Sequence, residues 1–246
     1  MGRSVEDLMD NSVNANWQNY WSDLPREQGL PVWDSAGEIT ATAQLPLFEP
    51  YFGTERAVLD VGCGNGTQTA ALARHFPRVI GADFAESAIE HARQLNSGTS
   101  ATFRHFDLTD ADAAAALHDE FGDLNVYMRG VLHQMPDEDR PKAAAALSVL
   151  LGESGHVFDV ELSPTAGLAM KTALGQSPDA VPKLQRVFKY GLTPAAWEEG
   201  KLEAVLDGAG VEVVVTGEVP LHGTDTMPDG TPLHLPMVYV VGRNRR

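Results

Sequence analysis

The stretch VLDVGCGNG, residues 58–66, decides the fold that this sequence predicts. Its first residues are typical of a buried strand, and glycines follow at positions 62, 64 and 66. A strand that runs into clustered glycines and then a helix lets a ligand approach the backbone at the helix N-terminus. The spacing is D-x-G-x-G-x-G from Asp60, which differs from the G-x-G-x-x-G of dinucleotide-binding folds, and no Lys-Ser/Thr pair follows to bind phosphate.

Short β-rich segments alternate with helix-compatible segments around this loop. We predict strands at residues 57–61, 78–83, 101–107, 124–129 and 156–162. This alternation indicates a parallel sheet with helices on both faces. Residues 211–217 and 237–243 are strands joined by a Pro/Gly/Asp-rich loop, which predicts an antiparallel hairpin at one sheet edge. The predicted fold is therefore α/β and Rossmann-like, with a mostly parallel seven-stranded sheet and a C-terminal antiparallel hairpin.

The chain has 246 residues, enough for one large α/β domain. We predict a single domain with an N-terminal helical cap at 1–50, a cofactor-binding core at 51–162, a substrate-side insertion at 163–193, and a C-terminal helix and hairpin at 194–246. In the last part, Thr193 as N-cap and Pro194 at the first helical position predict a helix that Gly208 and Gly210 close. The cap and the insertion are expected over the carboxyl edge of the sheet.

The composition limits the partners. The net charge of −16 argues against nucleic acid, whose phosphates require clustered Lys and Arg. The first residues lack the apolar core of a secretory signal, and no apolar run approaches the ~18 residues of a membrane span, so we expect a cytoplasmic protein without membrane contact. Cys63 is the single cysteine, which excludes an intrachain disulfide. The spacing of His222, Asp225, Asp229 and His234 matches no metal site, and we predict no metal.

Three carboxylates are predicted at the carboxyl ends of adjacent strands: Asp60, Asp83 and Asp107. A carboxylate in the position of Asp83 can accept hydrogen bonds from both hydroxyls of a ribose. Together the three would repel a pyrophosphate, but they suit ammonium, sulfonium, ribose and adenine amino groups. The predicted ligand is a positively charged adenosine compound rather than a phosphorylated one.

In these features the chain resembles the class I S-adenosylmethionine-dependent methyltransferases of the small-molecule type. The resemblance covers residues 56–162 and is carried by the order of VLDVGCGNG (58–66), VIGADFAESAIEHAR (79–93), FRHFDL (103–108), VYMRGVLHQM (126–135) and LGESGHVFDVEL (151–162). One position departs from the pattern. Many relatives have an aspartate inside the fourth strand, where this chain has Asn125, and we assign no role there.

The resemblance implies S-adenosylmethionine (SAM) as cofactor. It implies that Gly62 and Gly64 line the methionine part, that Asp83 holds the ribose, and that Asp107 with Leu108 meets the adenine. Asp60 would engage the amino end, directly or through water. Gly66, Phe84 and Arg129 complete the implied cofactor set, with Arg129 shaping the pocket. The alternative for Asp83 and Asp107 is an ordinary helix N-cap or a solvated turn.

Methyl transfer from a sulfonium is an in-line displacement, and alignment alone can remove up to ~7–11 kcal/mol of the barrier. A general base adds ~3–5 kcal/mol, so it is optional. The first candidate base is His133, because its segment leaves the fourth strand beside the expected methyl group and imidazole titrates near neutral pH. The alternative is a histidine that caps or packs the next helix.

Aromatic residues in the cap pose a similar choice. On a helix, Trp17, Tyr20 and Trp21 share one face and form either a lid over the ligands or a packing cluster. Tyr20 is the second catalytic candidate, because its hydroxyl needs a partner when buried. Met170, Phe188 and Tyr190 in the insertion line either the acceptor pocket or the core.

The leading hypothesis is SAM-dependent methyl transfer to a small aromatic or apolar molecule at oxygen, nitrogen or carbon, with natural-product tailoring as one setting. The partner is then a small-molecule methyl acceptor, and the protein is a monomer or homodimer. The alternatives are an NAD(P)-dependent oxidoreductase, against which the missing G-x-G-x-x-G counts, and a non-catalytic SAM-binding protein.

Overall fold

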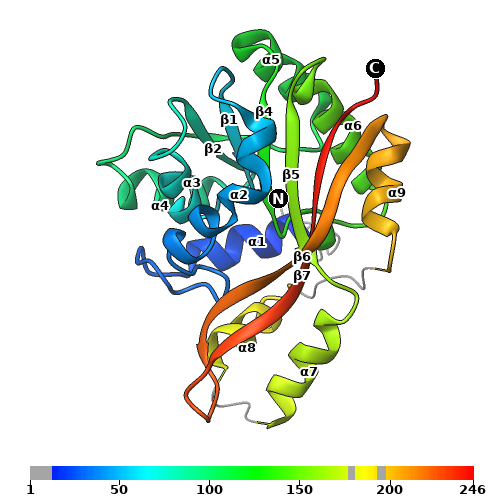
Figure 1. Cartoon of the computed structure of the whole chain (residues 1–246). Helices are drawn as coiled ribbons and strands as arrows, with labels where there is room; N and C mark the ends of the chain where they lie inside the picture. The colour runs from blue at the N-terminus through cyan, green and yellow to red at the C-terminus, as the bar shows by residue number, and fades with distance from the viewer. Residues whose placement is uncertain (1–12, 177–180, 193–197) are drawn as a thin grey trace, which may run out of the picture.

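The computed structural model describes residues 13–176, 181–192 and 198–246. In these residues the strands form one seven-stranded sheet of order β3-β2-β1-β4-β5-β7-β6 (Figure 1). The first five strands are parallel, and β7 runs antiparallel to both β5 and β6. The predicted fold is therefore confirmed. The strands are β1 (Val58–Val61), β2 (Val79–Asp83), β3 (Thr102–His105), β4 (Asn125–Arg129), β5 (His156–Leu162), β6 (Val211–Thr226) and β7 (Pro232–Asn244).

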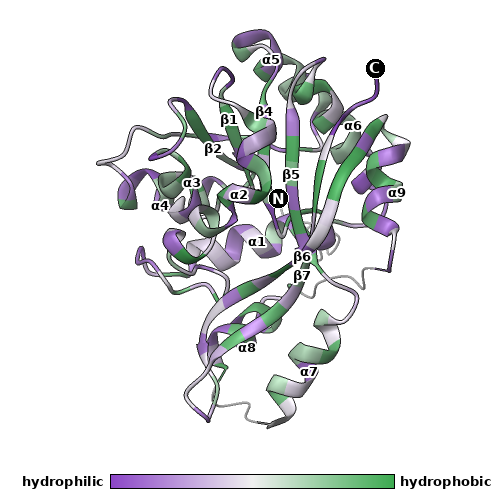
Figure 2. Ribbon diagram, in the orientation of Figure 1, coloured by the Kyte–Doolittle hydropathy of each residue, from purple (hydrophilic) through white to green (hydrophobic). Residues whose placement is uncertain are grey.

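Helices cover both faces of the sheet. One hydrophobic cluster joins one face to α2, α3 and α4, and a second joins the other face to α5, α6 and α9. Figure 2 shows the apolar central strands between helices with polar outer faces. The helices are α1 (Val13–Ser22), η2 (Gly37–Ile39), α2 (Ala41–Phe52), α3 (Thr67–Leu72), α4 (Glu86–Leu95), α5 (Ala111–Phe121), η3 (Leu132–Gln134), α6 (Arg140–Leu151), α7 (Ala166–Gln176), α8 (Pro182–Lys189) and α9 (Lys201–Gly208).

The strand order reverses at β1, which pairs with β2 on one side and β4 on the other. Open α/β sheets bind ligands in the crevice outside the carboxyl ends of the strands at such a point. The chain turns sharply there, because Gly62 has φ +71° and Gly66 has φ +79° as the left-handed N-cap of α3. The fold thus places the glycine loop at the crevice.

The C-terminal hairpin is longer than predicted. The loop expected between residues 217 and 237 is mostly strand, because β6 continues to Thr226 and β7 begins at Pro232. β5 pairs with β7 only as far as Met237, and beyond it β6 and β7 run on as a two-stranded ribbon toward α7 and α8 (Figure 1). Its prolines face each other, Pro220 opposite Pro236, outside the part of β7 that pairs with β5, where a missing N–H is tolerated.

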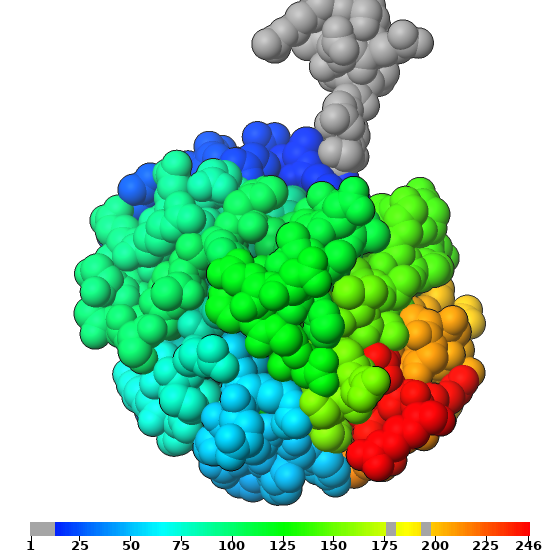
Figure 3. Space-filling model, turned by 90° about the horizontal axis from the view of Figure 1, so that it is seen from above, coloured from blue at the N-terminus to red at the C-terminus, as the bar shows by residue number. Residues whose placement is uncertain are grey.

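The C-terminal end packs beside the start of this ribbon. The Arg245 backbone N–H donates to the Gly210 carbonyl at 2.9 Å, and Figure 3 shows the last residues, in red, against the orange segment that leads into β6. The predicted N-cap at Thr193 and Pro194 lies outside the described residues. The helix is shorter than predicted, because residues 198–200 are not helical and α9 begins at Lys201 with Gly200 as its N-cap, but it ends at Gly208 as predicted. Within the described ranges, no helix is long and apolar enough to cross a membrane.

Candidate functional site

One cavity opens at the carboxyl ends of β1, β2 and β4, between α1 and the β6–β7 ribbon. It brings together most of the residues predicted from sequence. Those that line it are Asp60, Gly62, Gly64, Asp83, Phe84, Asp107, Leu108, Arg129, His133, Trp17, Trp21 and Met170. The other predicted residues, Gly66, Tyr20, Phe188 and Tyr190, are not among the lining residues.

The glycine loop is fixed by Asp83. The Gly64 N–H donates to Asp83 Oδ2 at 3.0 Å, and the Ala85 N–H donates to Oδ1 at 2.9 Å. There is no room for a side chain at Gly62 or Gly64, because a Cβ on Gly62 would lie 2.5 Å from Val131 and one on Gly64 would lie 2.8 Å from Trp21. Bare backbone therefore faces the cavity. Gly66 faces away, toward the ring of Phe103.

Burial changes the acidity of two cavity carboxyls. It raises the pKa of Asp60 to about 7 and that of Asp83 to about 6, although Asp60 accepts a hydrogen bond from Thr69 Oγ1 at 2.5 Å. A ligand that donates hydrogen bonds to these groups favours their ionised forms. Asp107 accepts hydrogen bonds from the backbone N–H and the hydroxyl of Thr109. It therefore stabilises a turn, which agrees in part with the alternative given for it in the sequence analysis.

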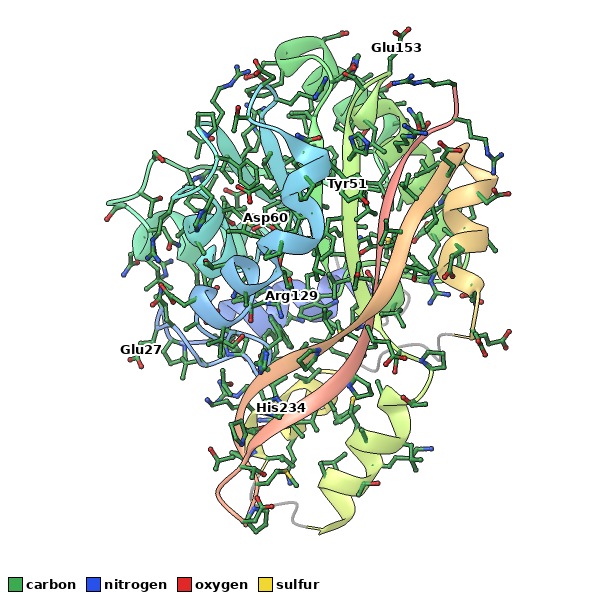
Figure 4. The ribbon with its side chains drawn as sticks, in the orientation of Figure 1. Glu27, Tyr51, Asp60, Arg129, Glu153 and His234 are labelled. Atoms are coloured by element: carbon green, nitrogen blue, oxygen red, sulfur yellow. The ribbon has the colours of Figure 1, made fainter. Side chains whose placement is uncertain are left out.

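Arg129 is the cation of the cavity. It ends β4, and its Nη2 donates to the Trp33 carbonyl at 3.1 Å. Its Nη1 is buried and has no hydrogen-bond partner among the described residues. Figure 4 labels Asp60 and Arg129 inside the body, in contrast to Glu27 and Glu153 at its periphery. A buried guanidinium nitrogen without a partner fits a ligand carboxylate.

His133 is buried on η3 and is held from behind by Glu161 of β5. Its Nδ1 contacts Glu161 Oε2 in a short hydrogen bond, and its backbone N–H donates to the same oxygen at 3.0 Å. Its Nε2 lies 2.8 Å from Nε2 of Gln134, and both side chains line the cavity. The imidazole is thus fixed on one side and reaches the cavity on the other.

The predicted aromatic residues of the cap form a cluster with Trp33. Trp17 and Trp33 meet edge to face at 5.3 Å between ring centroids, and both line the cavity. Tyr20 is 0% exposed behind them and also packs against Tyr190. Its hydroxyl has no partner within the described part of the chain, and burial raises its pKa. The geometry of Tyr20 agrees with the packing alternative.

Tyr190 and Phe188 lie outside the cavity. The Tyr190 hydroxyl donates to Asp23 at 2.6 Å, and Phe188 packs against the larger hydrophobic cluster. Asp225, in the β6–β7 hairpin, holds the start of α8. Its side chain accepts hydrogen bonds from the backbone N–H groups of Lys183 and Leu184. In the described residues, no three His, Cys, Asp or Glu side chains gather as a metal site.

Sequence reasoning missed two groups of cavity residues. The first joins the cap to the glycine loop: Asp34 accepts from the side chain of Asn65 at 2.5 Å, and both line the cavity with Trp33. The second is an apolar wall. It comprises Val32, Leu162, Leu184, Val187, Leu221, Leu235 and Met237. Leu233 and Leu235 stand at alternate positions, and Leu221 is followed by a polar residue, which is typical of a strand. The Pro and Gly residues of the same segment favour a loop instead.

The chain is similar to known proteins in sequence and in structure. Residues 58–155 match the family described as "Methyltransferase domain". A ubiquinone biosynthesis O-methyltransferase of Hydrogenovibrio crunogenus is 31% identical over 191 residues, which are 73% of this chain and 78% of the relative. A SAM-dependent methyltransferase structure from Anabaena variabilis is 30% identical with TM-score 0.87, over 95% of this chain and 96% of that one. A trans-aconitate 2-methyltransferase of Variovorax paradoxus is 31% identical over 57% of this chain and 51% of the relative.

The chain belongs to the SAM-dependent methyltransferases. The predicted enzyme class and cofactor are thereby confirmed, and neither the oxidoreductase nor the non-catalytic alternative is favoured. The cavity of the methyltransferase also fits SAM by its own chemistry. Its acid groups can accept hydrogen bonds from ribose and ammonium groups, and Arg129 Nη1, which has no hydrogen-bond partner among the residues that the structure describes, can donate to a carboxylate.

Proposed function

We propose that this methyltransferase methylates a hydroxyl oxygen of a small apolar molecule, with His133 as general base. The observation that carries the proposal is the orientation of His133 in the cavity. Its Nδ1 is engaged by Glu161, and among the described residues its Nε2 contacts another cavity side chain, that of Gln134. An acceptor hydroxyl in place of the Gln134 amide would donate to Nε2.

The cofactor would be held by the residues at the strand ends. Asp83 would accept from the ribose hydroxyls, Asp107 with Leu108 would meet the adenine, and the Gly62–Gly64 backbone would line the methionine part. Asp60 would meet the amino group and Arg129 the carboxylate. Bound SAM supplies an electrophilic methyl group on a sulfonium.

The residues of the chain then position the acceptor and take its proton. The acceptor hydroxyl would donate to His133 Nε2, which would take up the proton as the oxygen receives the methyl group, and the demethylated cofactor would be the leaving group. Because the wall around the acceptor is apolar, water is excluded from the reacting groups and the hydrogen bond to His133 is strengthened.

The lining residues also favour an apolar acceptor. The acceptor half presents Leu162, Met170, Leu184, Val187, Leu221, Leu235 and Met237. Arg129 is the single Lys or Arg among the lining residues that the structure describes, and it is assigned to the cofactor. A polycarboxylate such as the trans-aconitate in one relative's name would need several cations there. The O-methyltransferase name of the other relative agrees with transfer to oxygen.

We further propose the single-domain division at residues 1–50, 51–162, 163–193 and 194–246, with a monomer or homodimer in the cytoplasm and no nucleic-acid partner. The net charge of −16 supports the last point. The β6–β7 ribbon, which belongs to the sheet and also lines the cavity, supports one domain.

The test begins with calorimetric titration of SAM, its demethylated product and NADH, where only the first two should bind. Turnover is then measured by mass spectrometry with 1-naphthol, 1-naphthylamine and 1-naphthoic acid, and with larger phenols, amines and acids matched in the same way. A gain of one methyl on the hydroxyl compounds is expected. Preferential methylation of the amines or acids would contradict the proposal.

His133→Ala isolates the base. Turnover should fall by the ~10²–10⁴-fold that a general base contributes, while the Kd of SAM stays unchanged. If neither the rate nor the pH profile of turnover changes, His133 is not the base.

A further inference from the structure

Two buried carboxyls lie two residues apart on β5 behind His133, and their surroundings are opposite. Glu161 and Asp159 are both 0% exposed. Glu161 Oε1 accepts the N–H groups of Val131 and Leu132 at 3.0 and 2.8 Å, and Oε2 accepts the His133 N–H and contacts His133 Nδ1. Neither carboxyl oxygen of Asp159 accepts a hydrogen bond from an N–H or O–H donor in the part of the chain that the structure describes, and the polar group beside it is the carboxyl of Glu161.

These surroundings decide where the negative charge lies. Two neighbouring carboxyls in a low-dielectric interior cannot both ionise. The donors around Glu161, His133 first, lower its pKa, whereas burial and the charge of Glu161 raise the pKa of Asp159. Glu161 therefore carries the charge, and Asp159 keeps its proton.

The contact of His133 with Gln134 indicates the same proton arrangement on the ring. An amide nitrogen can only donate, so Gln134 Nε2 at 2.8 Å requires a lone pair on His133 Nε2. The proton of the neutral imidazole is then on Nδ1, where Glu161 accepts it. Both neighbours of the ring select one tautomer.

We propose that Glu161 is the positioning residue for His133, holding the neutral imidazole with its proton on Nδ1 and its Nε2 lone pair free for the hydroxyl of the methyl acceptor. The inference rests on the proposed role of His133 as base. Glu161 can do this because the backbone N–H groups of Val131 and Leu132 fix its other oxygen. When Nε2 takes up the hydroxyl proton, the same carboxylate stabilises the imidazolium.

An amide at position 161 cannot replace this arrangement. Both carboxylate oxygens face N–H donors, so in Glu161→Gln one of the two positions becomes an NH₂ group pointed at a donor. Asp159→Asn is the matched control, since it has the same burial, strand and isosteric change, and its amide N–H can donate to Glu161 as the protonated carboxyl of Asp159 does.

The first measurement is made on the wild-type protein without cofactor. Nitrogen NMR of the imidazoles at alkaline pH reports which ring nitrogen carries the proton. The signal of His133 is assigned, among the eight histidines, by its loss in His133→Gln. A proton on Nδ1 is expected. A His133 protonated on Nε2 would overturn the proposal, whatever Glu161→Gln does.

The second measurement compares the two carboxyl variants. In Glu161→Gln, the His133 signal should lose its single tautomer, the pH profile of turnover should change, and kcat should fall on the order of 10²-fold or more, within what a base contributes. Asp159→Asn should keep the wild-type spectrum, pH profile and kcat. Glu161→Asp, which retains the charge, should recover part of the loss.

The outcomes separate this inference from the proposed function. An unchanged tautomer and pH profile in Glu161→Gln, or an equal loss in Asp159→Asn, would overturn the role of Glu161 while His133 could remain the base. If instead His133→Ala keeps full turnover, the base assignment fails whatever the spectra show.

Discussion

The two halves of the cavity are built in different ways. The donor half, which we propose for SAM, consists of strand ends and one loop, where the Asp83 side chain accepts the N–H groups of Gly64 and Ala85 at 3.0 and 2.9 Å. The acceptor half consists of apolar side chains from α7, α8 and the β6–β7 ribbon, which are far apart in sequence. Groups on the sheet scaffold can hold one fixed cofactor, whereas the apolar wall can vary with the acceptor. Substitutions should therefore affect one half and spare the other.

The largest effect on binding is expected from Asp83→Ala. It would remove the two charge-assisted hydrogen bonds to the ribose that we propose for Asp83, each worth ~1.5–3 kcal/mol, so the Kd of SAM should rise on the order of 10²-fold or more. Calorimetry checks the Kd. Asp110→Ala is the control, because Asp110 caps α5 with its side chain and does not line the cavity. An unchanged Kd in Asp83→Ala would remove the ribose assignment.

Leu235→Ala should weaken binding of the acceptor and leave binding of SAM unchanged. Leu235 is buried in the ribbon wall, and losing part of an apolar contact costs an acceptor ~1–3 kcal/mol, so its KM should rise about tenfold or more. The Kd of SAM should not change. Steady-state kinetics with the best hydroxyl compound of the panel measure this. Val214→Ala, at an exposed site of β6, is the control. A loss of SAM affinity in Leu235→Ala would mean that the halves are not separate.

The donor half should also respond to pH. The pKa values of about 6 for Asp83 and about 7 for Asp60 lie above the ordinary range because burial disfavours the charge. Their protons must leave when ligand donors take their place. SAM affinity should therefore fall as pH falls from 8 to 5, by at most about tenfold per unit for each group. Calorimetry in buffers of different ionisation enthalpy should detect proton release near pH 6. Binding without proton release would contradict these carboxyls as ligands.

The smallest effect is expected from Tyr20→Phe. Its hydroxyl is buried without a partner among the described residues, so removing it should leave turnover unchanged and the free energy of unfolding equal or slightly higher. Thermal unfolding and kcat measure the two quantities. Tyr190→Phe, which loses a hydrogen bond to Asp23, is the comparison for the free energy of unfolding. A large loss of kcat in Tyr20→Phe would instead make Tyr20 the catalytic residue first predicted.

The donor half was predictable because its signals are local. The buried strand Val58–Val61 and the glycines after it occupy consecutive positions, and Asp83 ends the next strand along the chain. The acceptor half depends on contacts between distant segments. Asp34 meets Asn65 across 31 positions, and no pattern in either segment indicates the partner.

Glu161 and the ribbon were missed for different reasons. Glu161 lies near the end of the seven-residue strand β5, where an acid resembles an ordinary strand end, and its contact with His133 appears only when η3 folds over it. In residues 218–236, prolines and glycines are typical of a loop. At the sheet edge, however, the ribbon pairs with one neighbour only, so these residues remain compatible with strand.

The β6–β7 ribbon has a consequence for how acceptor preference can change. In β7, residues 237–243 pair with β5 and belong to the core, whereas residues 218–236 form strand pairs only within the ribbon and carry Leu221 and Leu235 into the cavity. One hairpin thus has a stem within the sheet and a tip at the acceptor side of the cavity. A chimaera that carries residues 218–236 from another family member should keep this fold and this cofactor while acquiring a new acceptor range.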